Sequence, residues 1–174
     1  MAQLDYLYEP QQKTEWCWCA VTASVARFYR KDAKWTQCKI ARLTLNRTDC
    51  CDSDSVGSVC NEPKPVDEPL LKLNHLEDVL NGHIGFDAVA EQIEQKKPVG
   101  VRISWPDQPG AGHVLVISGY DRDARTVTVE DPMFGRKQHY AYDLLVDQYI
   151  SNGYWSVTYL TRMNSPDEGD PDEA

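Results

Sequence analysis

The chain has 174 residues, of which 41% are hydrophobic and 10% aromatic, a composition typical of a globular protein rather than a disordered one. This length suits a single domain with a substantial core. The net charge of -9 argues against nucleic-acid binding, which depends on clustered lysine and arginine, and no apolar run is long enough to span a membrane.

The first half of the chain carries helical patterns. Residues 1–16 are expected to be extended, and a buried helix is predicted from Cys17 to Arg30, where "AVTASVA" is small or apolar throughout. The following stretch, 31–68, is polar, bears cysteines and ends with several prolines. It is expected to be an irregular, cross-linked excursion with one short helix at Thr36–Leu45.

Two more helices and four strands are predicted beyond this excursion. The helices are expected at Leu70–Leu80 and at Phe86–Lys97, where Pro98 ends the pattern. The strands are expected at "PVGVRISW", "HVLVISGY", "RTVTVED" and "YWSVTYLT", in which apolar and β-branched residues dominate.

Because helices precede strands, the chain is expected to be an α+β protein with a mainly antiparallel sheet. A single domain is predicted over residues 1–164. Its helical region spans residues 1–97, including the cysteine-rich excursion 31–68, and its sheet region spans residues 98–164. Residues 165–174 hold five carboxylates and no large apolar residue, so they are expected to form an acidic, disordered tail.

The residues needed for acyl transfer by a thiol are all present. Cys17 lies at the expected start of a buried helix, whose unpaired N–H groups favour a thiolate. His113 precedes an apolar strand and could carry the proton, although such a histidine is often only a hydrogen-bonded rim residue. Asp131, which equally fits a turn before proline, could orient it. Gln11 or Gln12 could supply an oxyanion donor.

These residues lie in a pattern that resembles papain-like cysteine proteases. Gln11 is six residues before Cys17, and Trp18 follows it. The resemblance is to the compact bacterial branch, which includes staphopains, plant-pathogen effector proteases and the leader peptidases of bacteriocin exporters. It covers most of the chain, including "CWCAVTASVARFY", "KKPVGVRISW", "GAGHVLVISGYD", "VTVEDPMFG" and "GYWSVTYLT".

The resemblance implies a papain-like fold, with a helical lobe that carries the nucleophile at a helix N-terminus and a carboxyl-terminal antiparallel sheet lobe. It implies that Cys17 is the nucleophile, His113 the general base and acid, Asp131 the orienting residue and Gln11 the oxyanion donor. It implies no cofactor and no metal. The substrate is expected to contact three residues near the cleft: Trp18, Trp105 and Gly112.

Cys19 stands where this branch is expected to have alanine. Two helical residues differ by about 200° in direction, so Cys17 and Cys19 cannot both face one cleft. The spacing from Gln11 and the following Trp18 select Cys17. Cys19 is therefore expected to be a small, buried packing residue.

Four cysteines lie within the excursion, and clustering of this kind indicates disulfides or a metal. They are Cys38, Cys50, Cys51 and Cys60. A bond between the adjacent pair would be strained, which leaves 38–50 with 51–60, or 38–51 with 50–60. Disulfides are favoured over zinc because the short spacing of zinc-binding cysteines is missing.

The predicted function is a cysteine endopeptidase that acts on protein or peptide substrates, as an exported effector or toxin. A toxin would have a cognate inhibitor or immunity protein as partner. The disulfides favour a secreted or exported location, although "MAQLDYLYEP" shows no signal peptide and a cytoplasmic location is the alternative. Two other functions remain open: glutamine deamidation or transamidation at the same thiol, and a non-catalytic binding module on this scaffold.

Overall fold

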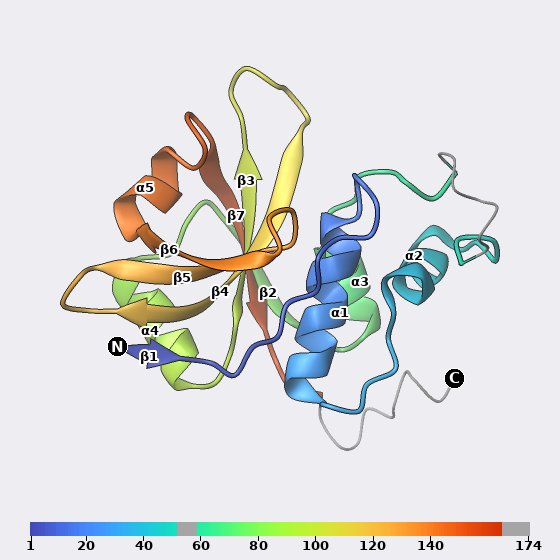
Figure 1. Ribbon diagram of the computed structural model, residues 1–174, viewed down its shortest axis with the longest axis horizontal. Helices are drawn as coiled ribbons and strands as arrows, with labels where there is room; N and C mark the ends of the chain where they lie inside the picture. Colours follow the sequence, from blue (N-terminus) through green and yellow to red (C-terminus); the bar gives the residue numbers. More distant parts are fainter. Residues whose placement is uncertain (52–58, 165–174) are drawn as a thin grey trace.

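The computed structural model describes residues 1–51 and 59–164, which contain five helices and one seven-stranded sheet (Figure 1). The helices are α1 (Cys17–Tyr29), α2 (Gln37–Leu45), α3 (Asp67–Lys72), α4 (Phe86–Glu94) and α5 (Tyr142–Asp147). The strands are β1 (Ala2–Gln3), β2 (Leu76–Asn81), β3 (Val99–Ser104), β4 (Gly112–Asp121), β5 (Thr126–Asp131), β6 (Arg136–Ala141) and β7 (Tyr154–Thr161). The predicted α+β class is confirmed.

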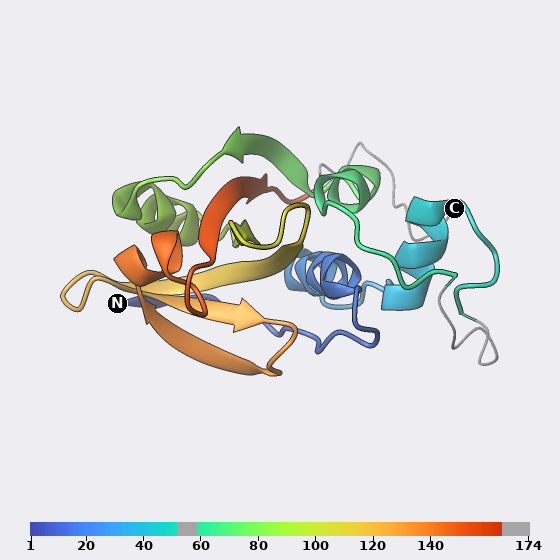
Figure 2. The same ribbon diagram turned by 90° about the horizontal axis from the view of Figure 1, so that it is seen from above.

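Helix α1 lies between the sheet and helix α2 (Figure 2). Every residue from Cys17 to Ala26 is buried, because the helix packs against β4 as well as against α2 and α3. Small side chains such as Ala20 and Ala23 suit a helix enclosed on several sides. The helix predicted at Cys17–Arg30 is confirmed to within one residue.

All strand pairs in the sheet are antiparallel, in the order β2-β7-β3-β4-β5-β6, and β1 pairs with β4. Strand β4 is buried from His113 to Tyr120, because α1 and α4 pack against it. The antiparallel hairpin of β4 and β5 brings the start of β4 near the end of β5. This hairpin positions the candidate site.

The helices predicted at Thr36–Leu45 and Phe86–Lys97 are confirmed as α2 and α4, although α4 ends at Glu94, three residues before the predicted end. Thr36 is the N-cap of α2 and accepts a hydrogen bond from the backbone N–H of Lys39. Asn46 ends this helix in the left-handed conformation, with φ of 51°.

The single helix predicted at Leu70–Leu80 is wrong. Helix α3 ends at Lys72, and Asn74 adopts a φ of 58°, which turns the chain into strand β2. Among the described strands it pairs with β7 alone, at the edge of the sheet, and its residues are half-buried or exposed. An exposed edge strand needs no alternation of apolar and polar residues. The sequence of β2 therefore lacks the pattern by which a strand is recognised, and it was read as part of a helix.

The predicted division into a helical region (residues 1–97) and a sheet region (residues 98–164) also needs correction. β1 and β2 come from the first region but belong to the sheet, and α5 comes from the second region. The tail predicted at residues 165–174 lies outside the described residues. No helix in the described ranges combines the length and apolar character needed to cross a membrane.

Candidate active site

Cys17 is the first residue of α1 and remains slightly exposed, at 8%. The N-cap residue, Trp16, makes no side-chain hydrogen bond to the first turn. The first turn of a helix presents backbone N–H groups without intrahelical partners, together with a partial positive charge. The Cys17 sulfur therefore lies where an anion is favoured.

His113 and Asp131 form a buried pair at one end of the β4–β5 hairpin. Nε2 of His113 lies 2.7 Å from Oδ1 of Asp131, and the two residues are 5% and 0% exposed. Cys17 lies close enough to the ring for its side chain to raise the pKa of His113. Because Asp131 takes Nε2, the nitrogen left for Cys17 is Nδ1. The three side chains thus form a chain from carboxylate to ring to sulfur.

The charges of this pair are set by competing effects. Burial alone lowers the pKa of His113, but hydrogen bonds with Asp131 and Cys17 outweigh it and raise that pKa to about 9. Burial raises the pKa of Asp131, whereas the hydrogen bond with His113 lowers it, and its pKa ends below the usual value. At neutral pH the ring is therefore cationic and the carboxylate anionic.

Tyr149 is a site residue that the sequence analysis missed. Its hydroxyl group is buried and donates a short hydrogen bond to Oδ2 of Asp131. The backbone N–H of Met133 donates to Oδ1 at 2.8 Å. Tyr149 lies 18 residues from Asp131, after α5, so no local motif pointed to the contact. These two donors fix the carboxylate that holds His113.

The other three histidines lie in different surroundings. His75 is buried and stacks on Tyr29, with ring centroids 5.2 Å apart, and its Nδ1 lies 3.1 Å from the carbonyl oxygen of Arg162. His83 and His139 are exposed. His113 alone among the four pairs with Asp131 beside Cys17.

Gln11 lies half-buried in the loop before α1. Its Nε2 donates to the carbonyl oxygens of Lys13 and Thr14, at 3.0 and 2.7 Å. Gln12, the other oxyanion candidate, is exposed, and its backbone N–H donates to Oε1 of Gln37. The Gln11 amide is therefore held by carbonyl groups of its own loop.

The three residues expected to contact substrate differ in exposure. Trp18 is fully buried, and its Nε1 donates to the carbonyl oxygen of Glu62 at 3.0 Å, so its predicted substrate contact is wrong. Trp105 is half-buried after β3. Gly112 is exposed beside His113, and a Cβ there would lie 2.7 Å from the guanidinium group of Arg102, so a larger residue would displace that side chain.

Cys19 is fully buried within α1, as expected for a packing residue. Burial raises the pKa of its thiol strongly, and the neighbouring Cys17 raises it further. A thiol that stays protonated is a weak nucleophile. The two cysteines of α1 therefore differ in their surroundings: Cys17 is slightly exposed at the helix N-terminus, whereas Cys19 is fully buried.

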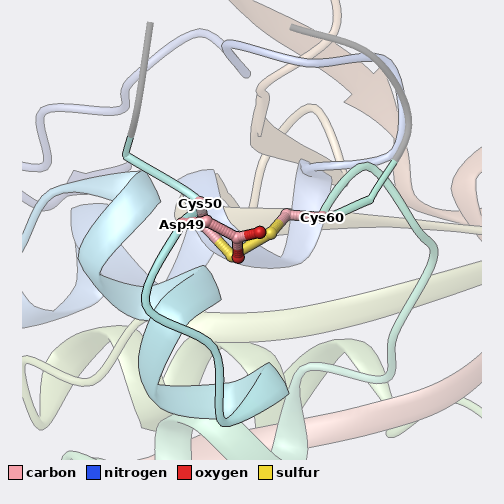
Figure 3. Close-up of side chains that lie close together, drawn as sticks. All are labelled: Asp49, Cys50 and Cys60. Carbon is pink, nitrogen blue, oxygen red and sulfur yellow. A yellow bond between two sulfur atoms is a disulfide. The ribbon is translucent and has the colours of Figure 1, made fainter. Parts of the chain in front are cut away.

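The excursion is cross-linked by two disulfides, Cys38–Cys51 and Cys50–Cys60. This is one of the two pairings that the sequence allowed. Asp49 lies beside the second bond (Figure 3), and its carboxylate and the two sulfurs lie within 4.8 Å of one another. Because both sulfurs are bonded to each other, this group offers no thiolate to a metal.

The comparison with known families matches most of the chain. The model of the Peptidase_C39 like family matches residues 3–160, which include Cys17, His113 and Asp131 and reach from β1 into β7. No curated protein matches the chain. An α+β fold with a seven-stranded antiparallel sheet is compatible with a papain-like peptidase. The match covers most of the chain, which therefore belongs to the Peptidase_C39 like family and is a cysteine peptidase.

Proposed function

We propose that the protein is an endopeptidase that hydrolyses peptide bonds in protein substrates through Cys17, His113 and Asp131. The observation that carries this proposal is the buried hydrogen bond between His113 and Asp131, together with Cys17 at the start of α1, where its side chain raises the pKa of His113. A cationic imidazole between a carboxylate and a sulfur at a helix N-terminus suits nucleophilic catalysis by a thiolate.

In the first half of the reaction, the Cys17 sulfur attacks the carbonyl carbon of the peptide bond. The C–S bond forms, and the carbonyl oxygen becomes an oxyanion. His113 donates its Nδ1 proton to the leaving amine as the C–N bond breaks, which leaves an acyl-enzyme. In the second half, the neutral ring removes a proton from water, the hydroxide attacks the thioester, and the Cys17 sulfur leaves.

The oxyanion is stabilised by the backbone N–H of Cys17 and by the side-chain amide of Gln11. In the free enzyme this amide donates to the carbonyl oxygens of Lys13 and Thr14. An anionic oxygen is a stronger acceptor than a neutral carbonyl. One N–H of the Gln11 amide therefore releases a carbonyl oxygen of its own loop and donates to the oxyanion instead. This hydrogen bond is strongest in the transition state.

The substrate lies along the half-buried Trp105 and the exposed Gly112, which flank the loop between β3 and β4. The two disulfides support an oxidising location, and hence a secreted or exported protein. For an exported peptidase we propose an effector or toxin role, with a protein substrate and a cognate inhibitor as partners.

The proposal is tested by mass spectrometry of an unfolded protein substrate after incubation with the enzyme. We expect new peptide termini with the wild-type protein and with Cys19→Ala, and none with Cys17→Ala. Glutamine converted to glutamate on an intact chain would show a deamidase instead. An unchanged substrate, together with an iodoacetamide rate at Cys17 no faster than that of free cysteine, would indicate a binding module.

A further inference from the structure

The loop before the nucleophile, residues 9–16, is here called the Gln11 segment. It contains no helix or strand, yet it carries the proposed oxyanion donor and leads directly into Cys17. A segment without regular structure depends on contacts from elsewhere to keep one conformation. The backbone N–H of Gln11 donates to the carbonyl oxygen of Pro132 at 3.0 Å, and the contacts on either side of Gln11 come from the cysteine-rich excursion.

Gln37, the first residue of α2, holds the two residues that flank Gln11. Its side chain is fully buried. Its Oε1 accepts a hydrogen bond from the backbone N–H of Gln12 at 2.9 Å, and its Nε2 donates to the carbonyl oxygen of Pro10 at 2.9 Å. The same nitrogen also donates to Oε2 of Glu9 at 3.2 Å. The backbone on both sides of Gln11 is thereby fixed to α2.

Asn61 holds the other end of the Gln11 segment. Its Oδ1 accepts a hydrogen bond from the backbone N–H of Glu15 at 2.9 Å, and its Nδ2 donates to Oγ1 of Thr14 at 2.8 Å. The preceding carbonyl, that of Cys60, accepts a hydrogen bond from Nε1 of Trp16 at 2.6 Å. Thr14 in turn supplies the carbonyl that holds the Gln11 amide.

The two anchoring residues are covalently tied to each other. Gln37 is adjacent to Cys38 and Asn61 is adjacent to Cys60. Cys38 is bonded to Cys51 and Cys60 is bonded to Cys50, and Cys50 and Cys51 are neighbours in the chain. Two disulfides and three peptide bonds therefore connect Gln37 to Asn61.

We propose that Gln37 and Asn61 are positioning residues that hold the Gln11 amide where it can reach the oxyanion, with the two disulfides as their frame. This rests on the proposed function, in which Gln11 is the oxyanion donor. A displacement of about 1 Å in a catalytic group can reduce a rate about 100-fold. Loss of either anchor therefore lowers kcat without removing any group that reacts.

The test compares Asn61→Ala, Asn61→Asp and Gln37→Met with the wild-type enzyme, and uses Gln95→Ala as a matched control. Gln95 is the exposed C-cap of α4, and its side-chain amide donates a hydrogen bond to Oε1 of Glu91 at 3.3 Å. We measure kcat, KM, the thermal midpoint and the rate of iodoacetamide alkylation at Cys17. In Asn61→Asp a carboxylate oxygen still accepts from Glu15 and can accept from the Thr14 hydroxyl, so this variant is expected to restore activity.

We expect kcat to fall about ten-fold or more in Asn61→Ala and Gln37→Met, with alkylation of Cys17 unchanged because the thiol–imidazole pair is intact. The double variant Gln11→Ala/Asn61→Ala should be no slower than Gln11→Ala, because both changes remove the same contribution, that of the Gln11 amide to oxyanion stabilisation. If Gln11→Ala lowers kcat and Asn61→Ala does not, the positioning role is overturned. Additive losses in the double variant, or slower alkylation, would overturn it as well.

These results also separate this inference from the proposed function. If Gln11→Ala leaves kcat unchanged while Cys17→Ala abolishes cleavage, the oxyanion role of Gln11 fails and the peptidase remains. Asn61 is only half-buried, so Asn61→Ala gives an answer even if the buried Gln37→Met does not fold.

Discussion

The hydroxyl group of Tyr149 donates a hydrogen bond to Oδ2 of Asp131, the carboxylate whose Oδ1 holds His113. Removing this donor in Tyr149→Phe should leave Asp131 less well oriented. We expect kcat/KM to fall about ten-fold, which corresponds to the loss of one charge-assisted hydrogen bond of about 1.5 kcal/mol.

Tyr142→Phe is the matched control for this prediction. Its hydroxyl group donates to the carbonyl oxygen of Ile84, away from Cys17 and His113. Kinetic measurements should show a loss in Tyr149→Phe and no loss of kcat in the control. Equal kcat values in the two variants would show that Tyr149 only stabilises the fold.

The pH profile should report the raised pKa of His113. The protonated ring is the acid for the leaving amine, so kcat/KM should decline as the pH rises through about 9. Asp131→Asn removes the carboxylate that raises this pKa, and the decline should then begin at lower pH. An alkaline limb that stays in place in Asp131→Asn would contradict the pairing.

The same pKa predicts how stability depends on pH. The pKa of His113 is raised on folding, from 6.5 to about 9. Its protonated form therefore stabilises the fold fully below 6.5, and this contribution disappears as the pH rises through about 9. In Asp131→Asn, denaturant titrations should show a smaller loss of stability over this interval than in the wild-type protein.

Most helices and strands were predicted correctly from the sequence. These are the elements that have one buried face or are buried throughout. The stretch "AVTASVA" indicated a buried helix, and β4 is largely apolar because residues on both of its faces are buried. The errors fell on the surface. The edge strand β2 was predicted as part of a helix, while β6 and α5 were not predicted because their exposed residues carry no clear period.

The candidate site was partly predictable for a different reason. Cys17, His113 and Asp131 each lie at the end of a predicted element, and antiparallel pairing of the two strands could bring His113 and Asp131 together. Tyr149, Gln37 and Asn61 make contacts between distant stretches of the chain, and a local sequence pattern does not predict such contacts. Trp18 was misassigned because a tryptophan beside a nucleophile can equally serve the core.

The disulfides should contribute measurably to stability. Cys50–Cys60 closes a short loop, with a sequence separation of 10 residues. Loss of a native disulfide in a small protein typically costs about 2–5 kcal/mol, so Cys50→Ser/Cys60→Ser should lower the thermal midpoint. Calorimetry of the variant beside reduced wild-type protein measures the effect. An unchanged midpoint in both would contradict a structural role for this bond.

Cys19 should be replaceable without loss of catalysis. It is fully buried, and alanine is the nearest apolar substitute for its small side chain. We expect Cys19→Ala to keep most of the kcat of the wild-type protein and to lose about 1 kcal/mol of stability. A Cys19→Ala variant that folds but is inactive would show that this thiol takes part in the reaction.

The assignment of Cys17 as the reactive nucleophile is tested most directly by alkylating the folded protein with limiting iodoacetamide at neutral pH and mapping the label by mass spectrometry. Cys17 lies at a helix N-terminus beside a cationic His113, whereas the thiol of Cys19 is buried and its pKa is raised. The label should appear on Cys17, faster than on free cysteine, and should slow in His113→Ala. A label on Cys19, or a Cys17 rate that does not depend on His113, would contradict the account.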